Sequence, residues 1–164
     1  VLATAGTLKG SKYLTTKGIY EDDVRIVEHV GQGFVELVEA GILDGPVAEE
    51  TVRRSLRPLL DAGADRIVLG CTHYPFLRNV IQRVAGPDVR IIDPAPAVAR
   101  HLVDVMREEG LPLSEAATPA GPATGKGSAP SEPRIELVTS GDNTSAKRIL
   151  DIVLEEDGIR HGRQ

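Results

Sequence analysis

The chain has 164 residues, of which 41% are hydrophobic and 26% are charged, as in ordinary globular proteins. Its formal net charge of −5 and its scattered Lys and Arg residues provide no basic field, so neither nucleic acid nor an anionic membrane is an expected partner. No apolar stretch approaches the roughly 20 residues that span a bilayer, and the single cysteine excludes an internal disulfide. We therefore expect a reducing, cytoplasmic setting.

Short apolar runs followed by helical patterns indicate an α/β fold with an open sheet and flanking helices. The predicted strands are residues 1–5, 66–69, 89–92 and 135–138. The predicted helices are 47–60, with its last turn disturbed by Pro58, a helix from Pro75 to 84, 98–106 ended by Gly110, and 146–154. The helix over 98–106 is expected to expose its apolar stripe. Residues 112–133 are rich in Pro, Gly, Ala, Ser and Thr, which predicts a flexible linker.

Two polar clusters follow predicted strands, and ligands of open α/β sheets bind at the carboxyl ends of strands. The clusters are Thr4 to Thr7 and Cys71-Thr72-His73, and we expect them to face one another across a crevice. Backbone amides at the helix start near Thr72 would favour an anion such as a carboxylate. The same field and the neighbouring histidine would lower the pKa of the Cys71 thiol, which makes it a candidate thiolate.

Each of these residues also has a purely structural interpretation. A lone cysteine after a buried strand is most often a small packing residue, and His73 could cap the helix or pack beside Tyr74. Threonines such as Thr4 and Thr7 commonly satisfy backbone groups of turns, and Glu39 would by default be a solvated surface charge. A Cys-x-His pair also suggests zinc, but the other histidines lack ligand spacing, so we expect no metal.

The run from Asp65 to Pro75, which contains Gly-Cys-Thr-His-Tyr-Pro, resembles the second cysteine motif of glutamate racemases. Further resemblances follow in the order of that family: residues 2–7, 34–39, 91–93 with 97–99, and 139–142. The family fold has two similar α/β halves. The resemblance implies that residues 1–93 form the second half, and that 94–111 and 134–164 return to the first.

The resemblance implies a cofactor-independent enzyme that interconverts L- and D-glutamate and supplies D-glutamate for peptidoglycan. Two thiols flank the α-carbon in this family, one removing a proton and the other returning one. Cys71 would be the second thiol and His73 would assist it. Thr4, Thr7 and Thr72 would contact the substrate glutamate, and Glu39 would lie near the site. The sequence leaves open whether the protein forms a homo-oligomer.

The family's first thiol, in an Ala-Cys-Asn-Thr motif, and its Asp-Ser-Gly turn have no counterpart in these 164 residues. We therefore expect the chain to be part of a longer protein and to be inactive by itself. Two alternatives remain: a racemase of the same superfamily acting on aspartate or another amino acid, and a non-catalytic module that binds carboxylates.

Overall fold

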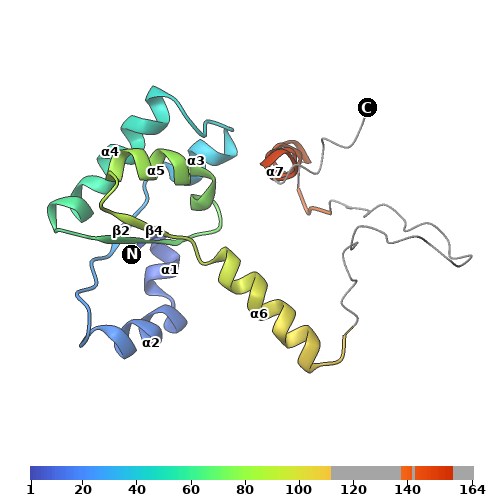
Figure 1. Cartoon of the computed structure of the whole chain (residues 1–164). Helices are drawn as coiled ribbons and strands as arrows, with labels where there is room; N and C mark the ends of the chain where they lie inside the picture. Colours follow the sequence, from blue (N-terminus) through green and yellow to red (C-terminus); the bar gives the residue numbers. More distant parts are fainter. Residues whose placement is uncertain (112–137, 142, 157–164) are drawn as a thin grey trace, which may run out of the picture. The chain divides into compact units, whose positions relative to one another are not determined.

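The computed structural model describes residues 1–111, 138–141 and 143–156. It contains a four-stranded parallel sheet in the order β2-β1-β3-β4 (Figure 1). The strands are β1 (Leu2–Ala3), β2 (His29–Val30), β3 (Arg66–Gly70) and β4 (Arg90–Ile92). The predicted α/β fold class with an open sheet is confirmed.

The register of the sheet brings the ends of β1 and β3 together. Leu2 pairs with Leu69 and Ala3 pairs with Gly70, so both strands end at the same edge. A Cβ added at Gly70 would lie 2.9 Å from the Cβ of Ala3, closer than two carbons can pack. Glycine at this position therefore allows the close approach of β1 just before Cys71.

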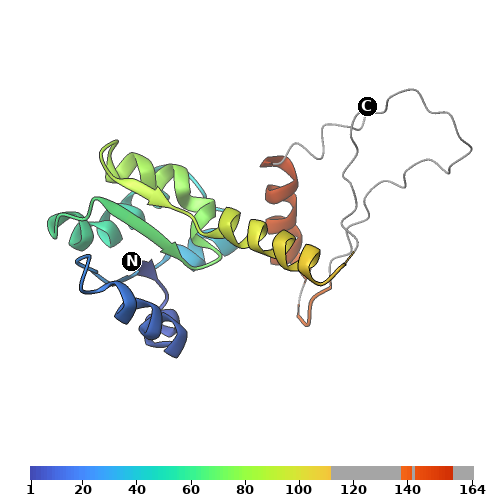
Figure 2. The ribbon, with the colours of Figure 1, turned by 60° about the horizontal axis from the view of Figure 1, so that its bottom comes forward.

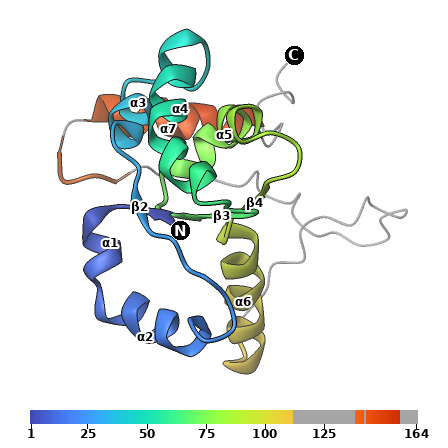
Figure 3. The same cartoon turned by 90° about the vertical axis from the view of Figure 1, so that its left-hand side faces the viewer.

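Helices lie on both faces of the sheet (Figure 2, Figure 3). On one side are α3 (Phe34–Glu39), α4 (Pro46–Asp61) and α5 (Arg78–Ala85), and on the other are α1 (Ala5–Lys9) and α2 (Ser11–Tyr20). A 3₁₀ turn, η1 (Tyr74–Leu77), connects the β3 edge to α5. The chain divides into two compact units, the first holding Val1–Pro94 with α7 (Asn143–Glu156) and the second holding α6 (Ala95–Glu108).

The core lies between the sheet and α3, α4 and α5. Alternate residues of β3, Ile67 and Leu69, are fully buried on this face. The buried residues of α4 recur at helical spacing: Ala48, Val52, Ser55, Leu56 and Leu59. Each fully buried Leu or Ile stabilises the fold by about 1.5–3 kcal/mol, so this layer fixes the position of the β3 edge.

The helix predicted over 47–60 is confirmed, but the structure continues it through Pro58 to Asp61. Pro58 is exposed and sits in the last turn, where its missing amide removes one hydrogen bond from a helix held by its buried face. The helix expected from Pro75 instead starts as the 3₁₀ turn at Tyr74. The strand predicted over 1–5 ends at Ala3, because Thr4 caps α1.

Helices α1, α2 and α3 and strand β2 were not predicted from the sequence. The predicted helix over 98–106 is confirmed within α6, where Gly110 adopts φ +64° just beyond the helix end and Val98 and Leu102 are exposed. The helix over 146–154 is confirmed within α7. Residues 135–137 of the fourth predicted strand and the linker over 112–133 lie outside the described residues, and Val138 is in no strand.

Candidate functional site

Thr4 and Cys71 each follow the last paired residue of neighbouring parallel strands, Ala3 and Gly70. The carboxyl edge of the sheet therefore brings the two predicted polar clusters to the same place, which is where open α/β sheets bind ligands. Cys71 is half-buried, packed against the edge of the core, and its sulfur is a free thiol.

A thiol, an imidazole and a carboxylate form a chain at this edge. Nδ1 of His73 lies 4.0 Å from Sγ of Cys71, and Nε2 lies 2.8 Å from Oε1 of Glu39. The carboxylate accepts a hydrogen bond from Nε2, so in the neutral ring Nδ1 is left as the acceptor that faces the thiol. The hydroxyl of Thr72 also lies 3.5 Å from Nδ1. This order matches the logic of a nucleophile, a base and a group that orients the base.

The thiol's turn is anchored by Tyr74, which is buried under the sheet edge with 1% of its surface exposed. Its hydroxyl donates to the carbonyl of Gly31 at 3.3 Å, and its ring meets Phe34 edge-on with centroids 5.0 Å apart. The pKa of Tyr74 is raised to about 12, mainly by burial and to a smaller extent by the nearby Cys71. The neutral, buried phenol of Tyr74 therefore connects the turn that holds Cys71 and His73 to the loop after β2.

Of the amides near Thr72, His73 and Tyr74 that were expected to favour an anion, that of Tyr74 is bonded within the turn. The N–H of Tyr74 donates to the carbonyl of Cys71 at 3.3 Å, and the N–H of Phe76 donates to the carbonyl of His73. A 3₁₀ turn that closes on its own carbonyls replaces the α-helical N-terminus that was expected after Cys71.

The structural interpretation of Thr4 is confirmed. Its hydroxyl accepts from the N–H of Thr7 at 3.3 Å and caps α1, and the two threonine hydroxyls lie 2.9 Å apart. The pair carries two hydroxyl protons, and the hydrogen bond between them uses one. The other remains to be directed at a ligand, so capping and ligand contact are compatible.

Two contacts of this site were not foreseen from the sequence. Glu39 and His73 are 34 residues apart, and Glu39 was placed only by resemblance. The guanidinium of Arg148, on α7, donates to the carbonyl of Glu39 across 109 residues. Neither pair has a spacing signal, because the contacts arise from packing of α3 against η1 and of α7 against α3.

Other features of the described residues do not compete with this edge as an acid/base site. A cavity of about 650 Å³ lies near the amino ends of the strands and is lined mainly by apolar residues such as Val27, Val68 and Ile92. Within residues 1–111, 138–141 and 143–156, no three His, Cys, Asp or Glu side chains are grouped to hold a metal ion. None of the helices in these ranges is both long and apolar enough to cross a membrane.

The fold and the site together define an α/β protein with a parallel sheet and, at its carboxyl edge, a thiol beside an imidazole that is bound to a carboxylate. The chain belongs to the Asp/Glu/Hydantoin racemase family, whose model matches residues 7–102, more than half of the sequence.

The chain is similar to proteins named glutamate racemase. It is 48% identical over 111 residues to that of Methylococcus capsulatus, covering 68% of this chain and 41% of the relative. It is 35% identical over 159 residues to that of Stutzerimonas stutzeri, covering 97% and 54% respectively. One similar solved structure is that of Escherichia coli glutamate racemase in complex with L-glutamate and the activator UDP-MurNAc-ala. The match covers 94% of this chain and 53% of the Escherichia coli chain, with 26% identity and a TM-score of 0.62. The chain thus spans about half the length of the relatives it matches.

Proposed function

We propose that this chain is the Cys71-bearing half of a glutamate racemase, which interconverts L- and D-glutamate by proton transfer between two thiols without a cofactor. The observation that carries the proposal is the contact between Cys71, His73 and Glu39 at the carboxyl edge of the sheet. Sγ of Cys71 lies 4.0 Å from Nδ1 of His73, and Nε2 of His73 lies 2.8 Å from Oε1 of Glu39. The similarity of the sequence to proteins named glutamate racemase supports glutamate as the substrate.

In this proposal each of the three residues has a separate task. Glu39 holds the Nε2 proton of His73, so Nδ1 accepts the proton of the Cys71 thiol and leaves a thiolate. The thiolate removes the α-proton of glutamate and becomes a thiol again, while a second thiol protonates the resulting carbanion from the opposite face. One proton leaves the α-carbon and another arrives, so the configuration inverts and the atoms balance.

The polar groups around Cys71 suit an amino acid. The hydroxyls of Thr4, Thr7 and Thr72 lie on the residues that follow β1 and β3 and supply donors for the carboxylate and acceptors for the ammonium group. In this role the enzyme would work in the bacterial cytoplasm and supply D-glutamate for peptidoglycan. The single thiol without a disulfide partner suits such a reducing compartment.

The mechanism needs two thiols, and the 164 residues contain one. We expect the chain alone to produce no D-glutamate from L-glutamate, as followed by chiral chromatography. Conversion that disappears in Cys71→Ser would overturn this expectation, because a single thiol would then suffice.

The function itself is tested by transplanting the chain into a complete relative. The segment of Methylococcus capsulatus glutamate racemase that matches this chain is replaced by the equivalent residues of this chain, which are 48% identical over 111 residues. We expect this chimera to racemise glutamate, to lose that activity on Cys71→Ser, and to leave aspartate unchanged. A chimera with native circular dichroism that does not racemise glutamate contradicts the proposal, and preferential turnover of aspartate corrects the substrate.

A further inference from the structure

Helix α3 ends in a backbone motif that leaves the carbonyl of its last residue available to a side chain. Gly41, at φ +72°, donates its N–H to Val38, and the N–H of Ile42 donates to the carbonyl of Leu37 at 2.8 Å. These two bonds make a Schellman motif and satisfy two of the carbonyls at the helix end. The carbonyl of Glu39, the last residue of α3, is outside this pattern.

Arg148 of α7 takes that carbonyl. Its Nη1 donates to the carbonyl oxygen of Glu39 at 2.7 Å. The aliphatic part of the same side chain crosses Gly41, where an added Cβ would lie 2.9 Å from Cδ of Arg148. The next residue, Ile149, packs against the hydrophobic core. A cation at the C-terminus of a helix also interacts favourably with the helix dipole, so charge and geometry act together.

Glu39 is thus held at two points with different consequences. Its carbonyl is bound by Arg148, and its carboxylate binds Nε2 of His73. The Glu39 side chain is 41% exposed and the His73 side chain 28% exposed. Because the Glu39 side chain is partly exposed, burial does not restrict its carboxylate to one rotamer. The position of the backbone at the end of α3 therefore decides whether the carboxylate reaches the imidazole.

We propose that Arg148 is a positioning residue that fixes the end of α3, so that Glu39 holds the His73 ring with Nδ1 toward Cys71. Arg148 binds the backbone of Glu39 and acts on the imidazole and the thiol through that residue. The inference rests on the proposed function of Cys71 as an acid/base thiol, and it adds α7 to the structure that supports that site.

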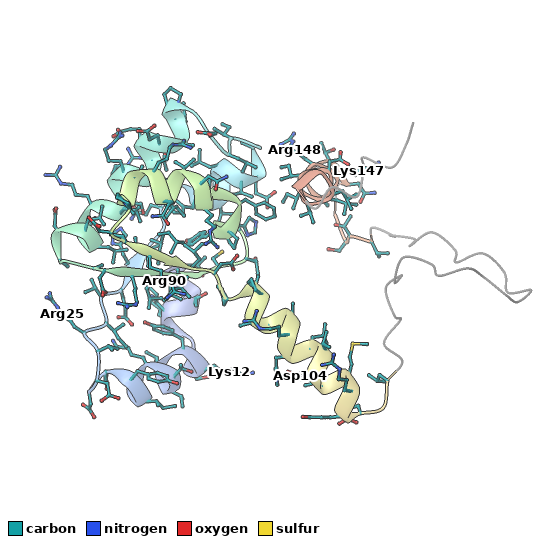
Figure 4. All side chains as sticks on the ribbon, in the orientation of Figure 1. Lys12, Arg25, Arg90, Asp104, Lys147 and Arg148 are labelled. Carbon is teal, nitrogen blue, oxygen red and sulfur yellow. The ribbon has the colours of Figure 1, made fainter. Side chains whose placement is uncertain are left out.

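The thiol itself reports on this arrangement, because Cys71 is the only cysteine in the sequence. The rate of its alkylation by iodoacetamide at fixed neutral pH measures the thiolate available in the 164-residue chain, without any racemase activity. Arg148→Met removes the donor and the charge but keeps the length of the side chain. Lys147→Met is the matched control: it removes a positive charge from the neighbouring residue, which is exposed and leaves α7 on a different side (Figure 4).

We expect Arg148→Met to slow alkylation about fivefold, as the loss of a typical hydrogen bond would do. Lys147→Met should alkylate at the wild-type rate, and Arg148→Lys, which keeps a cation and a donor, should recover most of the loss. The nitrogen NMR signals of the His73 ring, assigned by comparison with His73→Gln, report its tautomer. They should show one tautomer in the wild type and a mixture in Arg148→Met. A merely structural role of Arg148 would leave the tautomer unchanged and would accelerate alkylation by exposing the thiol.

Glu39→Gln separates failure of this inference from failure of the proposed function. If Glu39→Gln slows alkylation and Arg148→Met does not, Arg148 has no positioning role, but the link between Glu39, His73 and Cys71 stands. If neither substitution changes the rate or the tautomer, both the inference and the proposed relay are wrong.

Discussion

The buried contact between Gly31 and Tyr74 gives a severe test of how the thiol's turn is supported. A Cβ added at Gly31 would lie 2.7 Å from both Cζ and Oη of Tyr74. The ring cannot withdraw, because it is 1% exposed and Phe34 lies against it with centroids 5.0 Å apart. Overpacking of this kind costs about 1–3 kcal/mol, and losing the hydrogen bond from Tyr74 to the Gly31 carbonyl costs about 1 kcal/mol more.

We therefore expect Gly31→Ala to lower the free energy of unfolding by roughly 2–4 kcal/mol, as measured by urea titration with far-ultraviolet circular dichroism. Gly18→Ala is the matched control, since Gly18 lies within α2 and a Cβ there meets no atom within 4 Å. That substitution should stabilise the chain by about 0.5–1 kcal/mol, because alanine favours a helix over glycine. Equal stability of Gly31→Ala and the wild type would refute the packing described for Tyr74.

Two further predictions concern pH. The pKa of Tyr74 is raised to about 12 in the folded chain, from about 10 when unfolded, so its stabilisation is complete below pH 10 and is lost as the pH rises toward 12. Alkaline urea titrations should show this decline, and Tyr74→Phe should reduce it; an unchanged slope would contradict the burial of the phenol. The hydroxyl of Tyr13 donates to Glu28 at 2.7 Å and is the main cause of that carboxyl's lowered pKa. This stabilisation is fully present above the pKa of about 4.3 that Glu28 has in the unfolded chain, and it is lost as the pH falls below that value. Tyr13→Phe should therefore destabilise the chain by about 1 kcal/mol or less near neutrality, and by progressively less in acid. A constant difference from pH 7 to acid pH would show that Glu28 is not involved.

The elements that the sequence predicts best are those whose apolar residues face the core. The strands predicted over 66–69 and 89–92 are found at Arg66–Gly70 and Arg90–Ile92, and the helix predicted over 47–60 is found at Pro46–Asp61, because burial of one face imposes a pattern on each. Helix α2 has no buried residue, so its sequence carries no such pattern, and it was missed. Helix α3 has only six residues, too few for a helical period to emerge clearly.

The candidate site was predictable only in part for the same reason. Strand ends and a motif next to them located Cys71, His73 and Thr4, since parallel strands bring their carboxyl ends to one edge. The partners of His73 and of Glu39 lie 34 and 109 residues away, and only tertiary packing brings them together. Spacing along a chain holds no information on such contacts.

The central claim, that Cys71 is one of two acid/base thiols, is tested most directly by isotope exchange in the active chimera. With L-glutamate in D₂O, a two-thiol mechanism places deuterium on the α-carbon of the D-glutamate formed, while the L-glutamate recovered at early times keeps its proton. We predict this result for the chimera, and when Cys71 is replaced by serine we predict loss of conversion and of exchange from the enantiomer whose α-proton faces Cys71, while exchange from the enantiomer facing the second thiol persists. Rapid deuteration of recovered substrate, or conversion that continues in Cys71→Ser, would contradict the account.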